Sequence, residues 1–143
     1  MTIRVFIAHA WDYDHHYETL AGWIFGTPWH FTGTNRPILF ENMSVPKHDP
    51  IHARGRPAIE EALAQRIHRS DIVVAPAGLY ASHRDWIDFE VRTANYYGVP
   101  VLQVNPRGQQ RLSMTIKQAA DHEVNWNSQS VVNAILRNAR TIG

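Results

Sequence analysis

The chain contains no cysteine, and this absence excludes several kinds of site at the outset. Thiol nucleophiles, iron–sulfur clusters, cysteine-ligated zinc and disulfides all need that residue. An excess of one charge is also missing, since 14 Lys+Arg stand against 13 Asp+Glu and no basic run is present. We therefore expect neither nucleic acid nor a membrane surface among the partners of this protein.

Long apolar runs are missing as well. No stretch approaches the ~18 apolar residues of a membrane span, and the first residues lack the basic and then apolar pattern of a signal peptide. Together with the missing cysteine, this favours a cytoplasmic location, where the environment is reducing. The 143 residues, 44% of them hydrophobic, suit one globular unit, so we predict a single domain over 1–143.

What the chain does have is an alternation of short β-branched runs with segments of helical periodicity. The expected order is β-α-β-α-β-α-β-β-α. Strands are predicted at 3–8, 38–40, 71–75, 99–104 and 123–126, and helices at about 12–24, 57–67, 84–97 and 131–139. Strands separated by helices imply a mostly parallel sheet. The predicted fold is a flavodoxin-like, doubly wound α/β sheet of about five strands in a three-layer α/β/α arrangement.

In such a fold, ligands bind beyond the carboxyl ends of the strands. The loops that meet there are predicted at 9–14, 42–56, 77–84 and 105–112, and the second of these is unusually long. None of them is a glycine-rich phosphate turn, which argues against a P-loop and against a Rossmann fingerprint. The predicted third strand runs into Ala75-Pro76-Ala77-Gly78 and offers no aspartate for phosphorylation.

Nine histidines invite a metal site, but their spacing does not support one. His15 and His16 are adjacent, so on a helix they diverge by about 100°. His48 and His52 have Pro50 between them, which argues against a helix, and no carboxylate cluster completes a ligand set. We predict no metal. Serine hydrolase chemistry is not expected either, because the G-x-S-x-G element is absent.

Glu90 is the most unusual acid in the chain. It falls on the inward side of the predicted helix at 84–97, beside the apolar stripe of Ile87, Val91 and Ala94. A carboxylate in that position loses its hydration unless it reaches a pocket or a partner. Two explanations remain open from spacing alone: a functional carboxylate, or an ion pair at a packed edge.

At these residues the chain resembles a known family. Trp86 and Glu90 form a W-x-x-x-E element followed by Gly98-Val99-Pro100, which resembles the third helix of TIR domains that cleave NAD⁺. The segment 6–9 resembles the F-I-S-x end of the TIR first strand, and the segments 40–50, 121–127 and 131–135 resemble the prokaryotic TIR-like branch that includes the TIR subunit of Thoeris antiphage defence. The first of them departs from the pattern, because Ala8 and His9 stand where serine is commoner.

The resemblance implies an NAD⁺ hydrolase or cyclase whose catalytic residue is Glu90. NAD⁺ is then the substrate, no other cofactor is needed, and the product is an ADP-ribose derivative, such as a cyclic ADP-ribose isomer, read by a downstream effector protein. Substrate contacts are expected from His9, Ala10, Trp11, Asp12, Asn42, Ser44, Tyr80 and Trp86. Asn42 and Ser44 fit equally well as caps of the long loop.

The segment 42–56 corresponds to the TIR loop that packs against a neighbouring subunit, so a homo-oligomer is expected. Two other functions remain open. One is a non-catalytic TIR module that acts by association. The other is a nucleoside deoxyribosyltransferase-like enzyme, which shares the fold type and the glycosidic chemistry and would act on free nucleosides.

Overall fold

The computed structural model describes residues 2–8, 15–44, 55–78, 84–108 and 111–140. Along the chain its elements are β1 (Thr2–Ile7), α1 (His15–Phe25), β2 (Trp29–His30), β3 (Pro37–Asn42), α2 (Arg56–His68), β4 (Ile72–Pro76), α3 (Arg84–Tyr96), β5 (Val101–Val104), α4 (Met114–Ala119), β6 (His122–Val124) and α5 (Ser128–Asn138).

The sheet has the strand order β2-β3-β1-β4-β5-β6. β1 pairs in parallel with β3 on one side and with β4 on the other, and β5 and β6 continue in parallel. Only the two-residue strand β2 runs antiparallel, against β3. The strand order therefore reverses between β1 and β4, as in a flavodoxin-like sheet, and the predicted fold class is confirmed.

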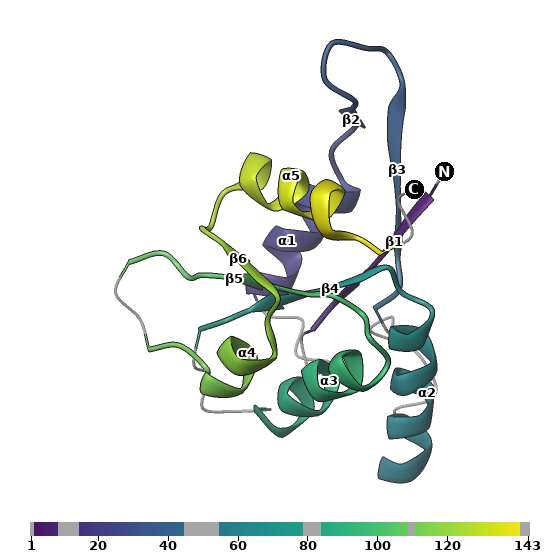
Figure 1. The fold of residues 1–143 in the computed structure, drawn as a ribbon, viewed down its shortest axis with the longest axis vertical. Helices are drawn as coiled ribbons and strands as arrows, with labels where there is room; N and C mark the ends of the chain where they lie inside the picture. The colour runs from purple at the N-terminus through teal and green to yellow at the C-terminus, as the bar shows by residue number, and fades with distance from the viewer. Residues whose placement is uncertain (1, 9–14, 45–54, 79–83, 109–110, 141–143) are drawn as a thin grey trace.

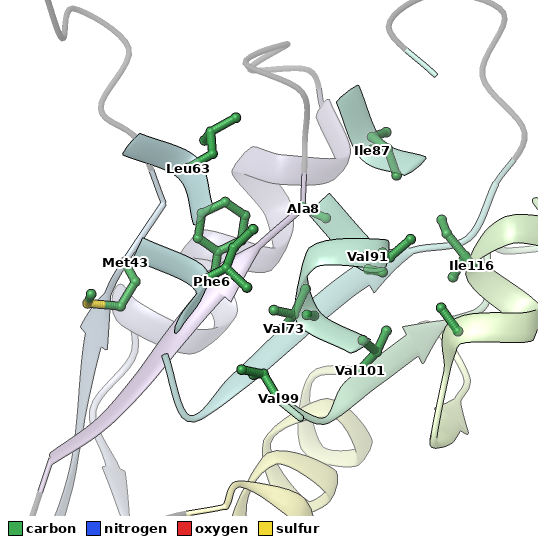
Figure 2. Packing of buried hydrophobic residues seen from close by; sticks show 14 of the residues in the cluster. Phe6, Ala8, Met43, Leu63, Val73, Ile87, Val91, Val99, Val101 and Ile116 are labelled. Atoms are coloured by element: carbon green, nitrogen blue, oxygen red, sulfur yellow. The ribbon is translucent and has the colours of Figure 1, made fainter. Parts of the chain in front are cut away.

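Helices cover both faces of this sheet, α1 and α5 on one face and α2, α3 and α4 on the other (Figure 1). β4 and β5 are buried along their whole length, as expected for parallel strands covered on both faces. Figure 2 shows the core on the α3 side, where Phe6 of β1 and Val73 of β4 lie near Val91 of α3. Ala8, just past the end of β1, belongs to the same cluster.

α3 ends in a Schellman motif that leads directly into β5. The Val99 N–H donates to the Ala94 carbonyl at 2.9 Å and the Gly98 N–H donates to the Asn95 carbonyl at 3.2 Å. Gly98 has a φ of 70°, a conformation that glycine adopts without the steric cost of a Cβ. The predicted stop at this glycine is therefore confirmed.

Two short elements were not expected from the sequence. α4 covers only Met114–Ala119, too few residues for a periodic signal, and it is held by its cap: the Ser113 hydroxyl accepts the Ile116 N–H at 3.2 Å. β2 has two residues that pair with Pro37 and Ile38. The sheet thus has six strands instead of about five, and a helix separates the last two.

The amino ends of β1 and β4 are joined through one buried aspartate. Asp71 accepts the Arg4 N–H on its Oδ2 at 2.8 Å, and its carbonyl accepts the Arg140 N–H at 3.0 Å. This contact ties together residues near the start, middle and end of the chain. None of the helices in the described ranges has the length and apolarity needed to cross a membrane.

Candidate functional site

The reversal in strand order identifies the edge of the sheet where a site is expected. β1, β3 and β4 all end at this edge, at Ile7, Asn42 and Pro76, and α2 and α3 begin after them. Ala8, Ala75 and Ala77 lie here in the core cluster under α3. Because these side chains are small, the sheet places few atoms beneath the first turns of that helix.

Glu90 is carried by the second turn of α3 and is 0% exposed. Its Oε2 atom is out of contact with solvent. The two flanking residues differ in burial: Val91 lies inside the core cluster, while Phe89 is only partly buried against it. The prediction that Glu90 points inward is therefore confirmed. A buried carboxylate needs a polar partner or a polar ligand to offset its desolvation, so both explanations given for Glu90 remain open.

Trp86 lies one helical turn before Glu90 and is partly buried against the same cluster. The Arg56 guanidinium carbon sits 4.4 Å from the centre of the Trp86 ring, a cation–π distance. The Phe89 ring meets Trp86 edge-on, with 6.1 Å between the ring centres. The start of α2 and the first turn of α3 are thus connected through one indole ring, whose position is fixed by contacts from both helices.

Ser44 continues the β1–β3 ladder beyond the last residue of β3. Its hydroxyl accepts the Ile7 N–H at 2.9 Å and donates to the Ile7 carbonyl at 3.4 Å. The Asn42 side chain accepts the Ser44 N–H at 2.9 Å and donates to the Tyr17 hydroxyl at 3.0 Å. These contacts favour the capping explanation for both side chains, and substrate contact by them stays a prediction.

Replacing Ser44 with alanine is expected to lower the free energy of unfolding by about 1–3 kcal/mol, because the buried hydrogen bond from the Ile7 N–H to the Ser44 hydroxyl is lost. Urea unfolding followed by circular dichroism measures the loss. Thr32→Ala removes a hydroxyl from an exposed position and serves as the matched control. Equal stability of the two variants would show that the Ser44 hydroxyl does not hold the end of β1.

Several predicted substrate contacts lie outside the described residues: His9, Ala10, Trp11 and Asp12 in 9–14, and Tyr80 in 79–83. The loop expected to meet a neighbouring subunit lies largely outside them too, at 45–54. His9 and Trp11 follow β1 in the sequence, and α3, which carries Glu90, follows β4. β1 and β4 do pair, with Ile7 opposite Val74.

Gln103, a buried polar residue in β5, was not predicted from the sequence. Its side-chain amide donates to the Asn105 Oδ1 at 2.7 Å and to the Glu123 Oε2 at 3.2 Å. The signal was present, because Gln103 interrupts the apolar run Val101 to Val104. Arg56 was missed as well, and no spacing reveals a contact made between two helices.

Within the ranges that the structure describes, no group of three or more His, Asp or Glu side chains is placed to hold a metal ion. The Ser44 and Asn42 side chains, near the carboxyl ends of β1 and β3, are engaged in the hydrogen bonds given above. The described part of this edge offers a buried carboxylate, Glu90, and an aromatic ring, Trp86, which is held by contacts from two helices.

The chain also matches a known protein family. The family model described as "Thoeris protein ThsB, TIR-like domain" matches residues 6–111, well over half of the chain. No curated protein matches the chain. The matched range runs from the end of β1 through α3 and β5, so it includes Glu90, Trp86 and Arg56.

Proposed function

The chain belongs to the TIR-like domain family of the Thoeris protein ThsB, and we propose that it cleaves NAD⁺ between nicotinamide and ribose with Glu90 as the catalytic residue. Membership of this family suggests a role in antiphage defence. The observation that carries the catalytic proposal is the complete burial of the Glu90 carboxylate on α3, one turn from Trp86.

The chemistry explains why one carboxylate suffices. As the C1′–N bond breaks, its electron pair leaves with nicotinamide, which departs as a neutral molecule and needs no general acid. The ribose that remains is oxocarbenium-like, and a fixed carboxylate stabilises its positive charge best where water is excluded. Burial of Glu90 provides that setting.

The fate of the ribosyl cation determines the product. Water adds hydroxide to C1′ and releases a proton, which gives ADP-ribose. Alternatively, a nucleophilic atom of the same molecule forms a bond to C1′ and a proton is released, which gives a cyclic isomer. Exclusion of water favours this second outcome. We propose that the product is a cyclic ADP-ribose isomer that a downstream effector protein detects, and that a homo-oligomer forms the active species.

Incubation of the purified protein with NAD⁺ tests the proposal. The expected result is release of nicotinamide, measured by liquid chromatography, with a product whose mass equals NAD⁺ minus nicotinamide. Assays at several protein concentrations test the oligomer, because specific activity per subunit rises with concentration if association completes the site. Absence of nicotinamide at every concentration would favour a non-catalytic TIR module, and cleavage of free nucleosides in its place would favour a deoxyribosyltransferase-like enzyme.

A further inference from the structure

A hollow of ≈ 480 Å³ lies between the start of α2 and the surface of α3. Small-molecule pockets in proteins have volumes of about 300–1,000 Å³, so its size is sufficient for a ligand. Asp88, Arg92 and Tyr96 lie along one ridge of α3 and line the hollow together with Phe89, Thr93 and Arg56. Spacing of four residues places that ridge away from the buried stripe of the helix. α2 and α3 lie side by side below the sheet in Figure 1.

Two guanidinium groups face this hollow. Arg56 is held in place by the Trp86 ring at 4.4 Å and by Glu60, whose Oε1 is 3.4 Å from the Arg56 Nε. Arg92 is exposed and forms no ion pair with any residue that the structure describes. Guanidinium groups bind phosphate through pairs of hydrogen bonds, and an arginine that is already oriented loses less entropy on binding.

Two aromatic side chains, Tyr96 and Phe89, also line the hollow. The Tyr96 side chain is 81% exposed, and its ring is braced edge-on by Tyr97, with 5.0 Å between the ring centres. Phe89 is braced in the same way by Trp86. Exposed aromatic faces can stack on nucleotide bases.

Asp88 adds a hydrogen-bond acceptor to the arginine and aromatic side chains that line the hollow. Its Oδ1 is buried, and in the part of the chain covered by the structure it has no hydrogen-bond partner. Arg92 lies one helical turn away, yet the two side chains do not form an ion pair. A buried acceptor without a donor is rare in proteins and favours a ligand that carries an N–H or O–H group.

We infer that this hollow binds an adenosine diphosphate group: the diphosphate at Arg56 and Arg92, the base against Tyr96 and Phe89, and a hydroxyl or amine donor at Asp88. Arg56 also touches Trp86, so the hollow adjoins the segment that carries Glu90. The inference rests on the proposed function in one respect, because NAD⁺ contains this group. A separate adenine nucleotide has the same chemistry.

Isothermal titration with ADP tests the site independently of catalysis, since ADP has no nicotinamide bond. We expect Arg92→Gln and Tyr96→Ser each to weaken ADP binding roughly tenfold or more, through loss of a charge-assisted contact and of stacking respectively. Both side chains are exposed, so the variants are expected to fold normally. Arg137→Gln removes an exposed arginine from α5, on the opposite face of the sheet, and is expected to leave the affinity unchanged.

Steady-state kinetics then separates the two sources of the ligand. If the hollow holds one half of NAD⁺, ADP inhibits competitively and Arg92→Gln raises KM with little change in kcat. If it holds a separate nucleotide, ADP binding weakens in Arg92→Gln while KM for NAD⁺ is unchanged. No ADP binding at millimolar concentration, or equal affinity in Arg92→Gln and Arg137→Gln, would overturn the inference. Nicotinamide release in that case leaves the proposed function standing.

Discussion

Glu90→Gln is expected to lower the rate of nicotinamide release by at least about 100-fold, the scale of one electrostatic group in a dry active site. Glutamine has nearly the same shape as glutamate, so the side chain still fills its buried place on α3. What it lacks is the negative charge that stabilises the oxocarbenium-like ribose. The measurement is kcat for nicotinamide release at saturating NAD⁺.

The control for this variant is Glu61→Gln, which removes a carboxylate from an exposed position on α2. We expect it to keep the wild-type rate. Circular dichroism and the melting temperature establish that both variants are folded. A folded Glu90→Gln protein with most of its activity would remove this residue from the mechanism and leave only the fold and the family to support cleavage of NAD⁺.

Phe6→Ala is expected to have the largest effect on stability, a loss of about 3–5 kcal/mol in the free energy of unfolding. Phe6 is 0% exposed and lies in the core cluster beneath α2 and α3 (Figure 2). Truncation removes its apolar contacts and leaves a cavity that a close-packed core fills only in part. Since the total free energy of unfolding of a domain is about 5–15 kcal/mol, this substitution is expected to remove a large part of it.

Urea unfolding measures this loss, with Leu39→Ala as the control. Leu39 lies on the neighbouring strand β3 but is 50% exposed, so its truncation is expected to cost much less. The comparison separates burial from strand position. Similar midpoints for the two variants would mean that the core on the α3 side does not dominate the stability of the fold.

The fold was predictable because each main helix or strand buries apolar residues whose spacing is visible in the local sequence. Ile59, Leu63 and Ile67 recur at helical spacing and are all buried in α2. The unbroken apolar run of β4 likewise predicted a strand covered on both faces. β2 and α4 could not be predicted in this way, because each is too short to be periodic and depends on the sheet or on a capping residue.

The candidate site was predictable to a smaller extent. Glu90 could be singled out because an acid on an inward stripe contradicts the local pattern. The contact of Arg56 with Trp86 could not, since it joins two helices and no sequence spacing records it. Ser44 was ambiguous for another reason: its residue type suits a cap and a substrate contact equally, and only the hydrogen bonds to Ile7 favour the first.

The position of β1 at the centre of the sheet has a consequence for the newly made chain. β1 is translated before both of the strands that pair with it, β3 and β4. Arg4 and its partner Asp71 are separated by 67 positions, which at about 5–20 residues per second is several seconds of synthesis. The bond from Arg140 to Asp71 forms later still. Until β4 has been made, the apolar residues of β1 therefore lack one of the two strands that pair with it.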